Sequence, residues 1–339
     1  MTASHIEPVV HGGDIDAARR RFPDAPEPWI DLSTGVNPHA YPVPPVDTAA
    51  WTRLPQSGAE RALREAAAQR YGAVGADHVI AAPGSQALIQ AIPRIITATD
   101  VVVLGPTYGE HAVSWARCGH RVEERASLSD IGDARVVVLV NPNNPTGRTI
   151  AAQQLGDLAA ELAQRDGLLV VDEAFADFEE GSVSLVSPQL PRAAVVLRSF
   201  GKTYGLAGAR LGFAIASDEG LRRRLRAELG PWAVSGPAVA VGTAALRDVA
   251  WLAAASERLA SDCARLDALL QNAGFEIVGG TRLFRLATHD RARAIADKLG
   301  RAGILVRRFP AAPEWLRFGL PGCDAQWQRL ASTLTEKKR

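Results

Sequence analysis

The chain has 339 residues, of which 47% are hydrophobic and 22% are charged, and its formal net charge is +1. This composition is ordinary for a globular protein with a large core, and the length favours two domains. The near-neutral charge gives no reason to expect nucleic acid or a membrane surface as a partner. No run of 18 apolar residues occurs, and the N-terminus lacks the apolar core of a signal peptide, so we expect a cytoplasmic protein.

The three cysteines, Cys118, Cys263 and Cys323, are widely separated and form no CxxC pair. They indicate neither a zinc site nor a disulfide framework, and they are typical of a reducing compartment. The histidines also lack metal-ligand spacing, so we expect no metal.

In chain order, the first 30 residues are expected to form an arm with one short helix near residues 14–21. The turn-rich segment 29–45 is expected to be a loop, and residues 59–71 have the spacing of a helix. From residue 78 to about residue 216, short Val- and Leu-rich strands alternate with helices. Continuous apolar runs are typical of strands buried on both faces of a parallel sheet, so the predicted fold class is α/β.

The pattern changes near residue 220, where an Ala- and Arg-rich helical region begins and continues to about residue 272. Short strands mixed with helices follow. We therefore divide the chain into an N-terminal arm at 1–30, a large α/β domain at 31–225 and a small C-terminal α+β domain at 226–339. The linking helix is expected at about 226–272.

Polar or reactive residues follow five of the predicted strands. Ligands of an open α/β sheet bind beyond the carboxyl ends of its strands, so these residues are candidates for one site. They are Ser85 with Gln86, Tyr108, Asn144, Asp172, and Ser199 with Lys202.

Each of these positions has a chemical and a structural interpretation. Ser85 opens a helix whose N-terminus favours a phosphate, although it could simply cap the helix. Asp172 ends an apolar strand, where a buried carboxylate needs a cation such as a protonated pyridine nitrogen or a salt-bridge partner. Lys202 could be a nucleophile in a confined site and Arg210 could bind a phosphate, although each alone could be a surface charge. The Asn144–Pro145 bond is a candidate for the cis form.

Three motifs together resemble the fold-type I pyridoxal-phosphate (PLP) enzymes of the aspartate aminotransferase superfamily. They are NPNNPTG (141–147), DEAF (172–175) and SFGKTYGLAGARLG (199–212). The resemblance extends from the N-terminal arm to Arg317. It implies the PLP-dependent transferase fold, PLP as cofactor, and a homodimer.

The resemblance also implies roles for individual residues. Lys202 matches the Schiff-base lysine, and Asp172 matches the partner of the pyridine nitrogen. Asn144 would bind the phenolic oxygen and Tyr108 would stack on the ring. Ser85, Gln86, Ser199 and Arg210 would hold the phosphate. Arg317 would bind the substrate carboxylate.

Two positions depart from the aminotransferase pattern. Phe175 stands where many relatives have Tyr, so one hydrogen bond to the cofactor is absent. Leu54 stands where relatives often have Tyr, which puts in doubt a phosphate contact from the partner subunit.

Two branches of the superfamily compete. Histidinol-phosphate aminotransferases share the arginine pair Arg307 and Arg317. The L-threonine-O-3-phosphate decarboxylases of cobalamin biosynthesis share it as well, and they also resemble this chain at HGGDI (11–15), IDLSTGVNP (30–38) and GPWAVSGPA (230–238). That resemblance favours the decarboxylase, with His11, Gly12, Gly35, Asn144, Arg307 and Arg317 as substrate-binding residues.

The expected reaction is the PLP-dependent decarboxylation of L-threonine O-3-phosphate to (R)-1-amino-2-propanol O-2-phosphate. The alternatives are a histidinol-phosphate or related aminotransferase and, more remotely, a non-catalytic PLP-binding regulatory domain. The sequence leaves open which arginine binds the carboxylate and which the phosphate. His11 could instead only tether the arm.

Overall fold

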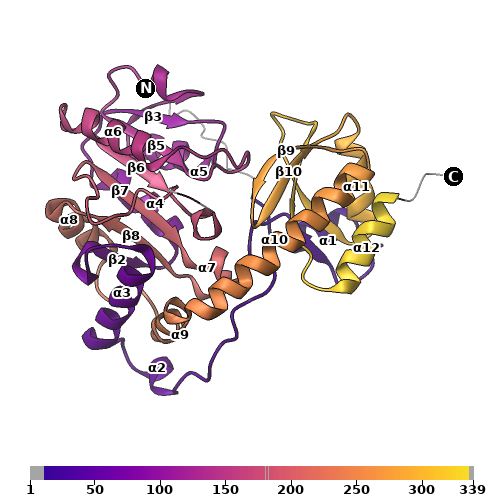
Figure 1. Ribbon diagram of the computed structural model, residues 1–339, viewed down its shortest axis with the longest axis horizontal. Helices are drawn as coiled ribbons and strands as arrows, with labels where there is room; N and C mark the ends of the chain where they lie inside the picture. Colours follow the sequence, from indigo (N-terminus) through magenta and orange to yellow (C-terminus); the bar gives the residue numbers. More distant parts are fainter. Residues whose placement is uncertain (1–10, 180, 182, 336–339) are drawn as a thin grey trace. The chain divides into compact units, whose positions relative to one another are not determined.

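The computed structural model describes residues 11–179, 181 and 183–335, which form two compact units (Figure 1). The first unit contains residues 41–144 and 148–252. The second contains, within the described part, residues 11–40, 145–147 and 253–335. The boundary between the units therefore crosses the NPNNPTG motif directly after Asn144.

The first unit is built on a seven-stranded sheet with the order β2-β8-β7-β6-β5-β3-β4. Only β8 runs antiparallel to its neighbours, so the sheet is mostly parallel, as predicted. Every residue of β5, β6 and β8 is buried, which explains their continuous apolar sequences. The strands are β2 (Val79–Ala82), β3 (Asp100–Leu104), β4 (Arg121–Arg125), β5 (Val136–Val140), β6 (Leu168–Asp172), β7 (Ala194–Ser199) and β8 (Gly212–Ala216).

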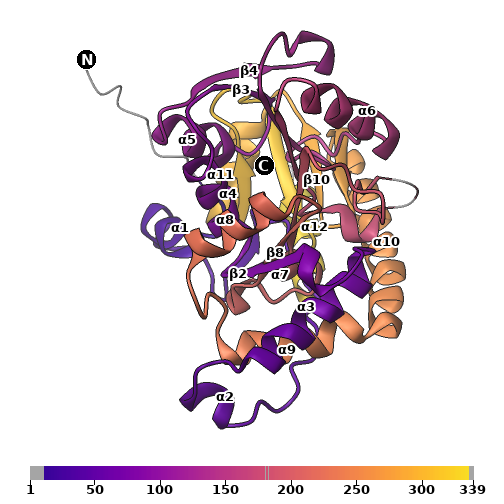
Figure 2. The same cartoon turned by 90° about the vertical axis from the view of Figure 1, so that its left-hand side faces the viewer.

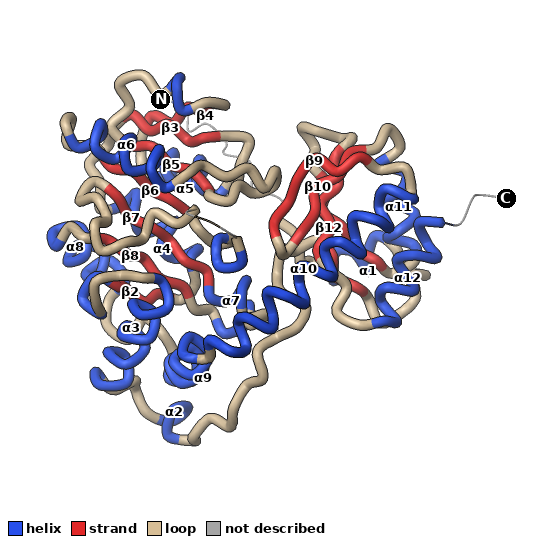
Figure 3. The backbone as a smooth tube through the Cα atoms, viewed as in Figure 1, coloured by secondary structure: helices blue, strands red, loops and turns tan. Residues whose placement is uncertain are grey.

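Helices cover both faces of this sheet (Figure 3). Alternate residues of β5 enter different cores, because successive side chains of a strand point to opposite faces. One core also contains residues of α4, α5 and α8, and the other contains residues of α3, α6 and α9; the turned view of Figure 2 separates the two groups. The helices are α2 (Ala49–Thr52), α3 (Ser57–Tyr71), η1 (Ala76–His78), α4 (Ser85–Arg94), α5 (Glu110–Arg117), η2 (Leu128–Asp130), α6 (Ala152–Ala163), η3 (Ala176–Phe178), α7 (Phe200–Thr203), η4 (Ala207–Ala209), α8 (Glu219–Leu229), α9 (Gly236–Arg247) and α10 (Val249–Asn272), of which α10 continues into the second unit.

The second unit has a five-stranded sheet with the order β1-β11-β12-β10-β9. The β1–β11 pair is parallel and the other pairs are antiparallel. Its strands are β1 (Ile30–Leu32), β9 (Glu276–Thr281), β10 (Phe284–Thr288), β11 (Ile304–Arg308) and β12 (Trp315–Gly319), and its helices are α1 (Ile15–Arg21), α11 (Ala292–Arg301), α12 (Asp324–Thr335) and most of α10.

The units differ in two ways from the ranges expected from the sequence. Residues 11–40 belong to the second unit, because β1 pairs with β11 there. The first unit continues past residue 225 to residue 252, because α9 packs against α3. Both differences arise from contacts between segments far apart in the sequence, which local patterns do not reveal.

Close backbone packing explains Gly147 at the end of the NPNNPTG motif. Gly147 has φ +73°, and a Cβ at this position would overlap the carbonyl oxygen of Gly280 in β9. The cis X–Pro bonds of the described residues are Glu27–Pro28, Gly105–Pro106 and Asn141–Pro142. The expected cis bond at Asn144–Pro145 was wrong, since the motif's cis bond precedes its first proline.

Among the described residues, no single helix has the length and apolar character needed to cross a membrane. The bent pair α9 and α10, with an angle of 76° between its helices, meets the length and composition criteria only as a pair.

Candidate active site

The start of α4 forms a cradle with Arg210. Gly84 precedes the helix with φ +89°, and a Cβ on it would lie 2.8 Å from the Arg210 guanidinium. A Cβ on Gly212 would overlap the amide nitrogen of Ser85, the first residue of α4. Ser199 is the register partner of Gly212. The helix N-terminus, the hydroxyl residues and the guanidinium therefore gather at one place, an arrangement suited to a phosphate.

Tyr108 is fixed beside this cradle by a short chain of side-chain hydrogen bonds. Its hydroxyl donates to Gln86 Oε1 at 3.1 Å, and Gln86 Nε2 donates to Glu110 Oε2 at 3.0 Å. Glu110 is buried in the first turn of α5. The Gln86 side chain thus connects the aromatic ring to a buried carboxylate.

Asp172 is the last residue of β6 and is 3% exposed. Its Oδ2 lies 3.0 Å from Nε2 of His111, and its Oδ1 accepts a hydrogen bond from the Ala174 amide at 3.1 Å. His111 is itself 1% exposed and contacts the Tyr108 ring edge-on, with 6.1 Å between ring centroids. The sequence interpretation rejected His111 as a metal ligand and missed this contact.

Two asparagines of the NPNNPTG motif stabilise its loop. Asn141 donates to the carbonyls of Ile150 and Val183 and accepts from the Ile150 amide. Asn143 accepts a hydrogen bond from Thr107 Oγ1 at 2.7 Å. These contacts fix the backbone on the N-terminal side of Asn144.

Lys202 lies in α7, a single turn that directly follows β7. Its Nζ is 5.3 Å from the centroid of the Phe175 ring. Phe175 is buried and follows β6. Lys202 is also the only lysine among residues 1–297 of the sequence. An amine, a buried carboxylate and an anion cradle therefore belong to the same unit and the same sheet edge.

Comparison with known proteins assigns the fold to a family. Residues 27–334 match the aminotransferase class I and II family. The chain is 43% identical over 327 residues to a threonine-phosphate decarboxylase of Pseudomonas aeruginosa. The alignment covers 96% of each protein.

The chain belongs to the aminotransferase class I and II family.

More distant members are also similar to this aminotransferase-family protein. Histidinol-phosphate aminotransferase 1 of Mesorhizobium japonicum is 33% identical, with 88% of this chain and 87% of the relative covered. The crystal structure of a histidinol-phosphate aminotransferase from Sinorhizobium meliloti in complex with pyridoxal-5'-phosphate superposes with a TM-score of 0.79, at 22% identity, and covers 98% of this chain and 97% of the other. The predicted PLP-dependent transferase fold is confirmed.

The residues of the first unit fit PLP, the cofactor of this aminotransferase family. PLP carries a phosphate, a basic ring nitrogen and an aldehyde. The cradle at Ser85 and Arg210 suits the phosphate, the buried Asp172 carboxylate suits a protonated ring nitrogen, and Lys202 supplies an amine. The individual assignments remain predictions, including those of Asn144 and Tyr108.

The second unit of this aminotransferase-family protein brings together most of the predicted substrate-binding residues. Arg317 is buried, and its Nη2 donates to the Ser33 carbonyl at 2.7 Å. Gly12 also packs on Ser33, since a Cβ on Gly12 would lie 2.5 Å from that carbonyl oxygen. Gly35 is two residues further along the same loop. The segments that contain His11 and Gly35 therefore meet at Ser33, next to Arg317.

Arg307 is the register partner of Arg317 across the antiparallel pair of β11 and β12. Directly opposite residues of such a pair project from the same face of the sheet. The two arginines also lie near aromatic rings, with Arg307 5.6 Å from the Phe309 centroid and Arg317 5.0 Å from the Phe284 centroid. Two guanidinium groups on one face of the sheet are suited to bind an anionic ligand.

Ser33 was missed by the sequence interpretation, although it lies within the quoted IDLSTGVNP segment. Its Oγ accepts from the Gly13 amide at 2.7 Å and donates to Asp31 Oδ1 at 2.6 Å. Only the folded chain shows that Ser33 contacts both the HGG segment and Arg317.

Proposed function

We propose that this protein is a threonine-phosphate decarboxylase that converts L-threonine O-3-phosphate to (R)-1-amino-2-propanol O-2-phosphate for cobalamin biosynthesis. The observation that carries the proposal is the 43% identity, over 96% of both chains, to a relative with that named activity. Relatives named histidinol-phosphate aminotransferase are less similar, at 33% identity or below.

The arginine pair supports an amino acid substrate with two anionic groups. L-threonine O-3-phosphate has a carboxylate and a phosphate, and a guanidinium can bind either with two parallel hydrogen bonds. We propose that Arg307 and Arg317 bind these groups, with His11, Gly12, Gly35 and Asn144 completing the substrate contacts. The cross-strand pairing of the two arginines gives this assignment its physical basis.

In the proposed cofactor site, Lys202 would supply the amine that binds the PLP aldehyde, and Asp172 would pair with the protonated ring nitrogen. Ser85, Gln86, Ser199 and Arg210 would hold the phosphate, while Tyr108 and Asn144 would contact the ring and its phenolic oxygen. When bound, PLP supplies an electron sink for the electron pair of the bond that breaks.

In this proposal, the arginines determine which substrate bond breaks. By fixing both anionic ends of the substrate, they orient the Cα–carboxylate bond for cleavage in preference to the Cα–H bond. The carboxyl group leaves as CO₂, and a proton replaces it on Cα. A transaminase with the same cofactor residues would instead have to orient the Cα–H bond.

The test is to incubate PLP-loaded protein with L-threonine O-3-phosphate and measure CO₂ and the phosphorylated amine. We expect both products in equal amounts, and no activity in Lys202→Ala. Serine phosphate in place of threonine phosphate measures the contribution of one methyl group, about 1–3 kcal/mol. If no CO₂ forms and the cofactor is converted to its pyridoxamine form by histidinol phosphate, the aminotransferase alternative replaces this proposal.

We also propose that the protein acts as a homodimer in the cytoplasm. Several apolar side chains of the first unit are exposed, among them Trp51 at 69%, Leu54 at 58% and Trp232 at 54%. Contiguous exposed apolar patches mark association surfaces, and we propose that these side chains contribute to one. Light scattering should give twice the chain mass of 36.1 kDa, and a mass equal to that of one chain would contradict the dimer.

A further inference from the structure

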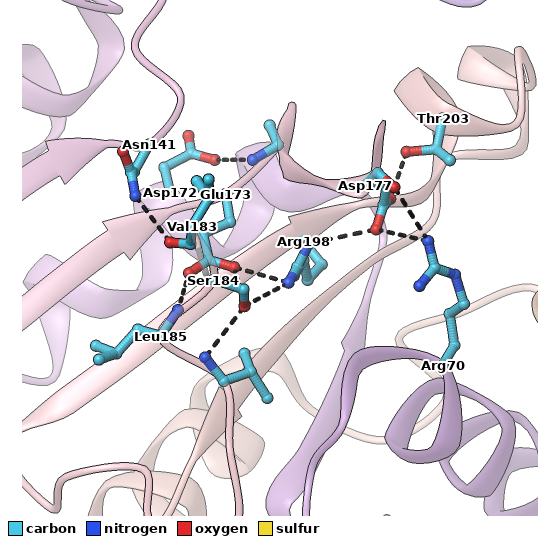
Figure 4. Close-up of polar contacts among 12 residues, drawn as sticks. Arg70, Asn141, Asp172, Glu173, Asp177, Val183, Ser184, Leu185, Arg198 and Thr203 are labelled. Carbon is cyan, nitrogen blue, oxygen red and sulfur yellow. Dashed lines mark hydrogen bonds and ion pairs between the residues drawn. The ribbon is translucent and has the colours of Figure 1, made fainter. Parts of the chain in front are cut away.

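Asp177 is a buried carboxylate with no place in the cofactor site described above. It lies in η3, the next element after β6, and its side chain is 4% exposed. Arg198 Nη1 is 3.2 Å and Arg70 Nη2 is 3.4 Å from Asp177 Oδ1. Its other oxygen, Oδ2, accepts a hydrogen bond from the hydroxyl of Thr203 (Figure 4).

This carboxylate is part of a buried charge network. Arg198 also forms an ion pair with Glu173 Oε2 at 2.7 Å and donates to Ser184 Oγ at 2.7 Å. Glu173 accepts further hydrogen bonds from the Ser184 hydroxyl and the Leu185 amide, both at 2.7 Å. Buried ion pairs cost desolvation free energy and are weak evidence for stability, whereas removal of one partner leaves an uncompensated buried charge, so the groups of this network depend on one another.

The network reaches Lys202 through one residue. Thr203 directly follows Lys202 in α7, which is a single turn from Phe200 to Thr203. A single helical turn is unstable on its own, because helix nucleation is unfavourable. A bond from Thr203 to a carboxylate that two arginines hold therefore restrains the turn that contains Lys202.

The same segment contacts the lysine side chain itself. Phe175 and Asp177 are two residues apart, and the Phe175 ring lies 5.3 Å from Lys202 Nζ. Asp172, at the start of this segment, is bound to His111. Residues 172–177 thus hold the proposed ring-nitrogen partner at one end and, through Thr203, the lysine-bearing turn at the other.

We propose that Asp177 is a positioning residue for Lys202, acting through the hydroxyl of Thr203. It sets where the lysine amine lies relative to Asp172, and so how readily that amine joins PLP. This inference rests on the proposed role of Lys202 as the Schiff-base residue.

The test compares Thr203→Val, Thr203→Ser and Asp177→Asn with the unsubstituted protein. PLP is removed and then added back, and the Schiff base is followed by its absorbance and by the pH midpoint of that absorbance. A hydrogen bond to a charged group contributes about 1.5–3 kcal/mol, so we expect formation to slow roughly 10- to 100-fold in Thr203→Val and Asp177→Asn. Thr203→Ser keeps the hydroxyl and should restore a rate within about twofold of the unsubstituted protein, since the bond to Asp177 is retained.

Thr243→Val is the matched control. Thr243 Oγ1 donates to the Val239 carbonyl within α9, so the same substitution removes a hydroxyl bond outside the network. Its rate and pH midpoint should stay unchanged. Thr203→Val leaves both arginine ion pairs intact, so it tests the proposal even if Asp177→Asn does not fold.

Thr203→Val with an unchanged rate and pH midpoint overturns the positioning role. Borohydride reduction followed by peptide mapping separates this outcome from failure of the proposed function. The sequence has only three other lysines, Lys298, Lys337 and Lys338. A label on one of them, or no label, refutes Lys202 itself as the Schiff-base residue.

Discussion

Arg307 and Arg317 face each other across the antiparallel strands β11 and β12. Like charges directly opposite in such a pair are destabilising, and cross-strand interactions of this kind amount to about 0.2–1 kcal/mol. The arrangement is explained if an anionic ligand neutralises the pair during function.

Arg307→Gln should therefore have opposite effects on stability and on ligand binding. Without ligand, the substitution should leave the melting temperature unchanged or raise it slightly, because the like-charge contact is removed. The KM for threonine phosphate should rise roughly 10- to 100-fold, because a charge-assisted hydrogen bond is lost. Thermal melts with and without threonine phosphate, together with steady-state kinetics, measure both effects.

Arg308→Gln is the control for this experiment. Arg308 is the next residue of β11, so its side chain leaves the opposite face of the strand, where it binds Asp297 at 2.8 Å. Its substitution should leave KM unchanged. Equal effects of the two substitutions on KM would contradict the anion-binding role of Arg307.

The contact between His111 and Asp172 leads to a second prediction. His111→Phe leaves a buried carboxylate oxygen without its 3.0 Å partner, at a cost of about 1–3 kcal/mol. We expect a lower unfolding temperature and weaker PLP binding, measured by titration of the cofactor-free protein. His120→Phe is the comparison, because His120 is also buried but contacts the Pro93 carbonyl and the Thr99 amide. PLP affinity that falls equally in both variants would argue against a specific role for His111.

Asp218 caps α8 and should make stability depend on pH. Its pKa is lowered by its hydrogen bond with Arg192, and also by the Leu221 amide at 2.7 Å. A lowered pKa in the folded state means that the stabilisation is present above the unfolded pKa, near 3.9, and is lost as pH falls through the folded value.

Asp218→Ala should therefore lower the free energy of unfolding by about 1 kcal/mol at pH 7, as expected for loss of an N-cap. The difference should become progressively smaller below about pH 4. Unfolding measured at a series of pH values gives the difference from the unsubstituted protein. Asp157→Ala, on the exposed part of α6, should show a much smaller cost. If the loss of unfolding free energy in Asp218→Ala stayed constant down to low pH, the stabilisation would not come from the ionised Asp218 carboxylate.

The cysteines should differ in reactivity. Burial raises the pKa of the Cys263 thiol to about 11, whereas Cys323 is exposed. Since the thiolate is the reactive form, a thiol reagent at pH 8 should label Cys323 in the folded protein and Cys263 only after unfolding. Peptide mapping of the labelled protein checks this, and fast labelling of Cys263 in the folded state would show the burial to be incorrect.

The sequence by itself was sufficient to predict the mostly parallel sheet and PLP as the cofactor. Strands buried on both faces must be continuously apolar, so β5 and β6 are recognisable without their neighbours. The Lys202 motif is equally local, because the residues that make it recognisable, 199–212, are contiguous in the chain.

Only the tertiary structure decided which distant residues act together. The pairing of Arg307 with Arg317 depends on strand register, and the contact of His111 with Asp172 depends on how α5 packs beside β6. Residues 11–40 join the second unit because β1 pairs with β11 across most of the chain. Register and packing are set by contacts summed over the whole fold, so a local pattern can single out Lys202 but cannot show that its neighbour Thr203 binds Asp177.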